Sequence, residues 1–228
     1  LSFLAWLSSR SIKLSIGTAI SFFLIGYFGM WKDTMSTMAI ISVATLICLI
    51  LGAPIGILMA RSQRLTNILS PVLDMMQTIP TFVYLIPIIM LLGIGKVPGL
   101  LAVCVYAIPP IVRLTNLGIR EVDKRFVEAA KALGIKKRVI LFKIEIPLAL
   151  PSIMTGVNQT IMMALAMVVI ASMIGVSGLG VPILRSISNQ FLALGLMNGL
   201  AIVALAIIFD RISQNYARRI QKHKNAKR

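Results

Sequence analysis

Acidic residues, histidine and cysteine are all scarce in this sequence. Of 228 residues only seven are Asp or Glu, one is His and two are Cys. Catalysis by paired carboxylates, by a histidine base or by a bound metal needs clusters of these side chains, and the sequence has none. His223 stands in a basic tail, and Cys48 and Cys104 lie in apolar stretches where a thiol behaves as a small hydrophobic group. We therefore expect no enzyme activity, no metal site and no disulfide framework.

A phosphate-binding loop of the form G-x-x-x-x-G-K-[ST] is also missing. The nearest stretch, Gly93 to Lys96, has neither the spacing nor the hydroxyl residue. This stretch and the segment 175–180 are predicted to be backbone bends on the outer side of the membrane, the second as a turn or a re-entrant loop. We expect no cofactor in this chain and no ATP hydrolysis by it.

Apolar residues, by contrast, are abundant: 58% of the chain is hydrophobic and only 13% is charged. A soluble fold needs a polar surface over its core, and here lipid must replace that surface. A bilayer-spanning helix needs about 20 mostly apolar residues. We predict an all-α, polytopic transmembrane helical bundle with six spans, at about 14–30, 35–60, 68–92, 100–117, 151–174 and 191–209. Prolines are expected to interrupt these spans at Pro54, Pro80, Pro87, Pro109 and Pro110.

Basic residues are unevenly distributed along the chain. With six spans, all but three of the 23 Lys and Arg fall on one side, the exceptions being Lys32, Lys96 and Arg185. The positive-inside rule then places both termini and the long central loop in the cytoplasm. This distribution explains the net charge of +16 without nucleic acid, which we do not expect as a partner. The basic tail, 211–228, is expected to anchor the chain at membrane lipid or to sense anionic lipid.

Two spans carry pairs of glycines four residues apart, Gly52 with Gly56 and Gly195 with Gly199. Such spacing lets helix backbones approach closely. The pairs fit either packing inside the bundle or dimerisation of the helices.

The segment 121–151 is long, charged and helical in pattern, which is unusual for a connection between two spans. Asp123 can cap the start of a helix, and Gly134 can supply a left-handed stop at its end. A second amphipathic piece, 136–145, should end before Pro147, which suits the first turn of the next span. The alternative is an amphipathic loop lying on the membrane surface. In the helix that Asp123 would cap, Phe126, Ala130 and Leu133 recur at helical spacing on one apolar face.

This segment resembles the cytoplasmic signature of the permease family of ATP-binding cassette (ABC) importers: a Glu-Ala-Ala triplet, then a glycine, then an apolar residue before proline. The residues that match in order and spacing are Glu128, Ala129, Ala130, Gly134, Ile146 and Pro147. The resemblance covers about 35–210. Within the family the chain is most similar to the glycine betaine/proline uptake type, in the stretches 74–84, 93–99, 156–160, 169–174 and 178–180.

The resemblance implies the type I importer permease (MetI-like) fold with cytoplasmic coupling helices. It divides the chain into an N-terminal region with the first helix (1–30), a permease domain (31–213) whose coupling loop is 118–150, and a basic cytoplasmic tail (214–228). It implies a homodimeric pore in a bacterial or archaeal plasma membrane. The implied partners are ABC ATPase subunits that bind ATP and Mg, and an extracytoplasmic substrate-binding protein. The implied solutes are glycine betaine, proline betaine or related quaternary amines.

Polar and aromatic residues in or near the spans are candidates for the translocation path, because polar groups in lipid are costly. They are Asp74, Gln77, Phe82, Tyr84, Asn158 and Gln159. The aromatic rings could offer cation-π faces to a quaternary ammonium. The same residues also fit interhelical hydrogen bonding and packing.

Two other functions compete with this one. The same architecture could import an amino acid or a sulphonate, which the candidate path residues do not exclude. An ion-coupled secondary transporter would need inverted repeats and buried carboxylates near the bilayer midplane, whereas the acidic residues here lie mostly in loops or near span ends.

Overall fold

The computed structural model describes residues 12–225, with side chains placed for residues 16–214. Within this range every regular element is helical, which confirms the all-α prediction. The elements follow in the order α2 (Ile12–Tyr27), α3 (Trp31–Arg61), α4 (Gln63–Thr78), α5 (Thr81–Leu92), α6 (Lys96–Arg120), α7 (Lys124–Ala132), α8 (Lys137–Ile140), the π-helical η1 (Leu141–Glu145), α9 (Ile146–Ala171), the 3-10 turn η2 (Ser172–Ile174), α10 (Gly180–Asn189) and α11 (Leu192–Asn225).

Four helical stretches are long and apolar enough to cross a membrane: α3, α6, the continuous run Lys137–Ile174, and Leu192–Gln214 of α11. The predicted third span, 68–92, is not one straight helix, because α4 and α5 meet at an angle of 99°. Counted as one span, this bent pair makes a fifth crossing. In α2 the apolar helix Ile16–Tyr27 is shorter than the roughly 20 residues that a span needs. Among the described residues the structure therefore has four or five spans rather than the six predicted.

Only one of the five prolines singled out above lies at a break between helices. Pro80 separates α4 from α5, and the preceding residue, Ile79, is extended (φ −66°, ψ 129°). The residue before a proline is disfavoured from the helical region, so the break falls here. The prediction that the other four interrupt the spans was wrong, because packing neighbours let a membrane helix keep its course around a proline. Those four lie inside α3, α5 and α6.

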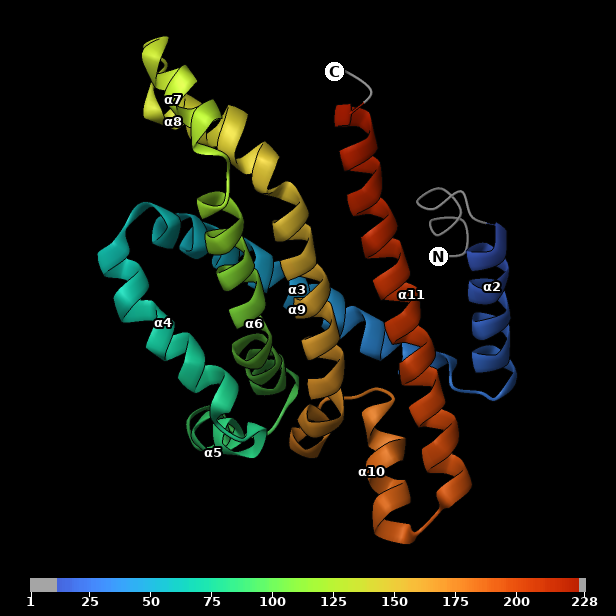
Figure 1. Ribbon diagram of the computed structural model, residues 1–228. Coiled ribbons are helices and arrows are strands. Elements are labelled where there is room, and N and C mark those ends of the chain that lie inside the picture. The colour runs from blue at the N-terminus through green and yellow to red at the C-terminus, as the bar shows by residue number, and fades with distance from the viewer. Residues whose placement is uncertain (1–11, 226–228) are drawn as a thin grey trace.

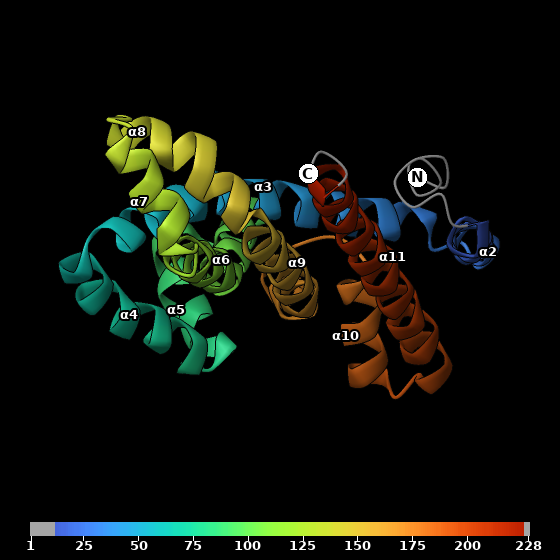
Figure 2. The same cartoon turned by 45° about the horizontal axis from the view of Figure 1, so that its top comes forward.

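The bundle is built around α3, α6 and α9, which all contact one another. In Figure 1, α6, α9 and α11 run side by side while α3 crosses behind them, and Figure 2 shows the same arrangement from a second direction. A Cβ added to Gly52 would lie 2.5 Å from the Ile111 side chain, and one at Gly56 would lie 2.6 Å from the Val112 carbonyl oxygen. This pair of glycines therefore packs α3 against α6 inside the bundle.

The second glycine pair behaves differently. A Cβ at Gly195 would meet the Ser186 side chain of α10 at 3.1 Å, whereas one at Gly199 would meet nothing within 4 Å. Among the described residues, therefore, only the first glycine of this pair serves packing.

The glycine-rich segments between helices are backbone bends, as predicted. Gly93, Gly175 and Gly178 have positive φ values of 74°, 90° and 141°. The two bends meet where the Gly95 N–H donates to the Ile174 carbonyl at 2.9 Å. At the opposite end of α6 and α9, the short helices α7 and α8 project from the bundle (Figure 1).

Candidate coupling segment and translocation face

The helix α7 begins and ends where the local signals predict. The Asp123 side chain accepts a hydrogen bond from the Arg125 backbone N–H at 3.0 Å, and its carboxylate pairs with the Arg125 guanidinium at 2.7 Å. These hydrogen bonds hold the pKa of Asp123 below its usual value. At the other end Gly134 has φ +70°, and the Ile135 N–H donates to the Ala130 carbonyl at 3.1 Å. Both the predicted cap and the predicted left-handed stop are confirmed.

The Glu-Ala-Ala triplet is divided between the surface and the interior. Glu128 and Ala129 are exposed, while Ala130 is buried at 3% exposure. Of the three residues predicted to share one apolar face, only Ala130 is buried; Phe126 is 44% exposed and Leu133 is 79% exposed. Leu133 lies one residue beyond the end of α7, so the helical spacing no longer determines where its side chain points.

Apolar side chains are exposed along residues 121–145, which we call the α7–η1 segment. The large ones are Phe126, Leu133, Ile135, Val139 and Phe142. They alternate with basic residues. Phe126, Leu133 and Ile135 precede the long apolar run Lys137–Ile174, whereas Val139 and Phe142 lie at its start. An apolar patch rimmed by charge marks a surface that binds another protein or a membrane.

The α7–η1 segment runs without a break into the membrane helix. The predicted stop before Pro147 was wrong, because helix continues from Lys137 to Ile174. In the π-helical turn the Ile146 N–H donates to the Leu141 carbonyl, five residues back. Pro147 is the second residue of α9 and directly follows this π-helical turn. Ile146 and Pro147 are half-buried at this junction.

The candidate path residues of α4 and α5 surround the bend between these helices. Asp74 forms an ion pair with Arg113 of α6. The Tyr84 hydroxyl donates to the Met76 carbonyl, which ties α5 back to α4. Gln77 and Phe82 are exposed.

The two candidates on α9 have different surroundings. The Asn158 side-chain N–H donates to the Asp210 carboxylate of α11 at 2.7 Å, and the same oxygen accepts from Gln214 at 2.7 Å. Gln159 is exposed. Asp74 and Asn158 thus link helices within this chain, whereas Gln77 and Gln159 face outward.

One face of α9 is left open along its length. Its other sides contact α3, α6 and α11. The exposed residues recur at helical spacing, and we call them the open face of α9: Leu148, Thr155, Gln159, Met162 and Ala166. Within one chain the candidate path residues form no common enclosed site.

Several charged residues with contacts to other helices were not recognised from the sequence as site residues. In the sequence analysis three arginines entered only through the distribution of charge: Arg61, Arg113 and Arg120. Two acidic residues, Glu145 and Asp210, entered only as carboxylates in loops or near span ends. Each has a partner on another element of the structure. The sequence signal that could have identified them is an arginine next to apolar residues, because a charge in such surroundings needs a partner.

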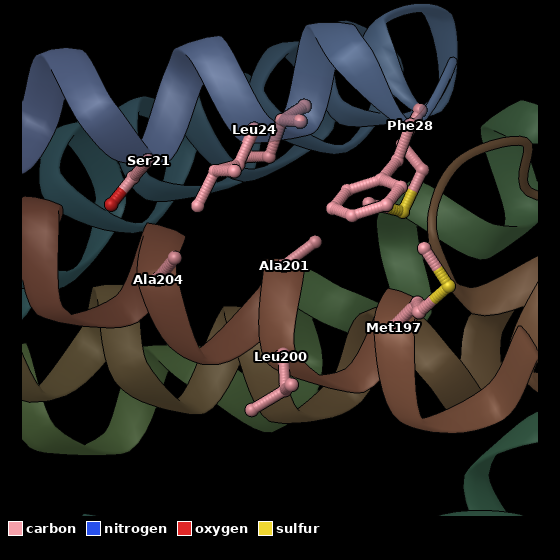
Figure 3. Close-up of a pocket in the computed structure, with 9 residues that line it drawn as sticks. Ser21, Leu24, Phe28, Met197, Leu200, Ala201 and Ala204 are labelled. Carbon is pink, nitrogen blue, oxygen red and sulfur yellow. The ribbon is translucent and has the colours of Figure 1, made fainter. Parts of the chain in front are cut away.

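The cavities that the structure contains near α11 are apolar. One of them, with a volume of about 180 Å³, lies between α2 and α11, and Figure 3 shows residues that line it. Ser21, Leu200 and Ala204 also line a neighbouring cavity of about 290 Å³, and a third of about 480 Å³ lies between α10 and α11. None of these three linings contains a charged side chain, so lipid fits them better than a polar solute does.

Comparison with known proteins gives one family match and several close relatives. Residues 52–222 match the family model described as binding-protein-dependent transport system inner membrane component. The glycine betaine/proline betaine transport system permease protein of Escherichia coli is 48% identical over 215 residues, covering 94% of this chain and 60% of that protein. The glycine betaine transport system permease protein of Bacillus subtilis is 43% identical over 210 residues, covering 92% and 74%. The chain thus spans less than two thirds of the Escherichia coli relative.

Among solved structures, the inward-facing methionine ABC transporter MetNI superposes with a TM-score of 0.75 at 19% identity, covering 83% of this chain and 94% of that one. At this identity the likeness concerns the fold alone. The fold is that of the type I importer permeases, as the resemblance implied.

Proposed function

Because the chain belongs to the family of binding-protein-dependent transport system inner membrane components, we propose that it is the permease subunit of an ATP-driven importer for glycine betaine, proline betaine or a related quaternary amine. The family match over residues 52–222 carries the proposal. The named glycine betaine permeases, at 43% and 48% identity, support the solute class. The chain is a multi-pass membrane protein whose task is to move the solute rather than to change it chemically.

The energy comes from partner subunits in this proposal. ABC ATPase subunits hold ATP and Mg and dock on the α7–η1 segment, and an extracytoplasmic binding protein delivers the solute. The exposed apolar side chains beside Glu128 and Ala129 support the docking role. In this proposal buried Ala130 packs α7 against the rest of the chain, and Gly134 turns the backbone after α7. Ile146 and Pro147, at the start of α9, transmit a displacement of the α7–η1 segment to that helix. ATP binding then favours one of two states of the pore because the ATPase binds that state more tightly.

A second copy of the chain completes the pore. The open face of α9 supports this, because one side of a helix at the centre of the bundle is without a neighbour within the described chain. Gln77 and Gln159 face outward and line the path in this proposal, while Asp74 and Asn158 hold its walls in place. Phe82 and Tyr84 lie beside the bend and present aromatic faces to a quaternary ammonium.

Both termini lie in the cytoplasm in this proposal. The ends of α3 and α6 carry Arg61 and Arg120, and the basic α7–η1 segment lies beside them. The last described part of α11 ends at the same end of the bundle (Figure 1). A positive cytoplasmic side agrees with this arrangement.

The alternative solutes receive less support. The methionine transporter resembles this chain in fold at 19% identity, which does not favour an amino acid. An ion-coupled transporter needs buried carboxylates at the midplane, and the side chain of Asp74 is 61% exposed.

The test is transport in proteoliposomes that contain this chain with its ATPase and binding protein. We expect glycine betaine to be taken up and to stimulate ATP hydrolysis. Glu128→Lys and Gly134→Val should reduce uptake about tenfold or more, within the usual range of coupling energies between sites. Arg185→Gln, at an exposed position on α10, is the control and should transport normally. Uptake of an amino acid but not of betaine contradicts the solute class, and failure to bind any ATPase contradicts the importer role.

A further inference from the structure

The helices α3 and α4 meet at a tight corner, residues 59–66, that is held by its own hydrogen bonds. Ser62 ends α3 and begins α4, and its hydroxyl oxygen accepts from the Leu65 N–H at 3.4 Å. The Thr66 hydroxyl donates to the Met59 carbonyl at 2.8 Å. Met59 is 1% exposed, so this α3–α4 corner packs into the interior of the bundle.

The last residue of α6, Arg120, reaches into the α3–α4 corner. Its guanidinium donates to the Gln63 side-chain oxygen at 2.8 Å, to the Thr66 hydroxyl at 2.8 Å and to the Met59 carbonyl at 3.0 Å. The fork of an arginine suits several acceptors in fixed positions. Arg120 therefore joins the end of α6 to both helices of the corner.

The last residue of η1, Glu145, makes a second contact with the corner. It forms an ion pair with Arg61, the last residue of α3, and only 10% of the Glu145 side chain is exposed. A buried carboxylate is costly to leave without a partner. The pair therefore holds η1 against the corner.

The α7–η1 segment is thus fastened to the same corner at both of its ends. Arg120 directly precedes the segment in the chain, and Glu145 is its last residue. A partner that displaces the segment must move the corner with it or break both contacts.

The helix α4, which follows the corner, is loosely packed against the bundle. Only Leu73 is buried among its residues. By contrast, α6 and α9 are closely packed: a Cβ at Gly118 would lie 2.6 Å from the Ser152 side chain, and one at Gly156 would lie 3.2 Å from the Ile111 Cα. We therefore expect these two helices to move as one body. Along its length α4 is held to α6 mainly by the Asp74–Arg113 ion pair and by Leu73, so it can move relative to them.

We propose that the α3–α4 corner, held by Arg120 and by the Arg61–Glu145 pair, passes displacement of the α7–η1 segment to α4 and the bend that follows it. This inference rests on the proposed function, because it assigns the route by which an ATPase acts on the path. Arg61, Arg120 and Glu145 are positioning residues in this route and touch no solute.

The test measures how ATP changes the labelling rate of a single introduced thiol, in proteoliposomes that contain the ATPase. One thiol is placed on α4 by Ile68→Cys and the other on the open face of α9 by Met162→Cys, both at exposed positions. The native cysteines are buried. In the otherwise unchanged chain we expect ATP to alter both rates. In the double variant Arg120→Gln/Glu145→Gln the response at position 68 should fall about fivefold or more, the low end of usual coupling between sites, while that at 162 persists.

The matched control is Arg64→Gln, which removes a charge from an exposed side chain of the same corner. Both responses should persist in it. If the double variant does not fold, Arg120→Lys and Glu145→Gln are tested singly with the same criterion. A response at position 68 that survives loss of the contacts overturns the proposal, as does loss of both responses while the ATPase stays bound. If the unchanged chain binds no ATPase, the proposed function fails instead.

Discussion

Gly56 lies where α3 touches the backbone of α6, and a methyl group there has no room. Its Cβ would lie 2.6 Å from the Val112 carbonyl oxygen. We expect Gly56→Ala to lower the free energy of unfolding by about 1–3 kcal/mol, the usual cost of overpacking. Gly199→Ala is the matched control, because a Cβ there meets nothing within 4 Å. It should be neutral or gain up to about 1 kcal/mol from the better helix propensity of alanine.

The measurement is unfolding of the purified protein in detergent, followed by loss of helical signal. Equal effects of the two substitutions would mean that α3 and α6 do not approach as closely as the structure indicates.

Residues that act through local backbone geometry were predictable one by one. Asp123 and Gly134 are such residues, because a cap and a left-handed stop involve neighbours a few positions away. Residues that act through distant partners were not. Asp74 pairs with a residue 39 positions away, Asn158 with one 52 away and Arg61 with one 84 away. No spacing rule connects residues so far apart in the sequence.

At the scale of elements, the start of α7 depends on one acidic side chain. The hydrogen bonds from Arg125 lower the pKa of Asp123. The ionised carboxylate therefore stabilises α7 fully at pH values above the ordinary Asp pKa of about 3.9. The contribution is lost as the pH falls through the lowered value. We expect Asp123→Ala to speed amide hydrogen exchange in 124–132 at neutral pH. Asp123→Ser keeps a capping oxygen but no charge, and its effect should be smaller.

Hydrogen exchange followed by mass spectrometry of the intact permease measures this effect. Exchange in α3 serves as the internal reference. Unchanged exchange in α7 with Asp123→Ala would show that α7 does not depend on its cap.

Apolar composition predicted where most of the long helices lie, but not how each one runs. Pro54 lies inside α3 while Pro80 ends α4, although both stand in apolar stretches. Whether a proline bends a membrane helix depends on the neighbours that accept the freed backbone groups. Likewise, the π-helical turn Leu141–Glu145 joins two segments that the sequence predicted to be separate.

At the scale of the whole molecule, the open face of α9 predicts where two copies meet. With Met162→Cys, bifunctional thiol reagents of graded length should link two chains in the membrane, because this face borders the shared path in the proposed function. Ile20→Cys is the control: it is 54% exposed, against 42% for Met162, but α2 lies at the far edge of the bundle (Figure 2). Electrophoresis under denaturing conditions shows the linked dimer. Linking through position 20 and not through 162 would place the second copy elsewhere.

The sequence by itself determined the helical class, the membrane setting, the family and the ends of α7. These follow from apolar run length, charge distribution and short motifs, all of which act locally or through composition. Only the tertiary structure decided which polar residues link helices, that α4 and α5 bend by 99°, and that both ends of the α7–η1 segment meet one corner. The physical reason is that charges in an apolar bundle need partners, and the packing of distant helices alone selects which partner is in reach.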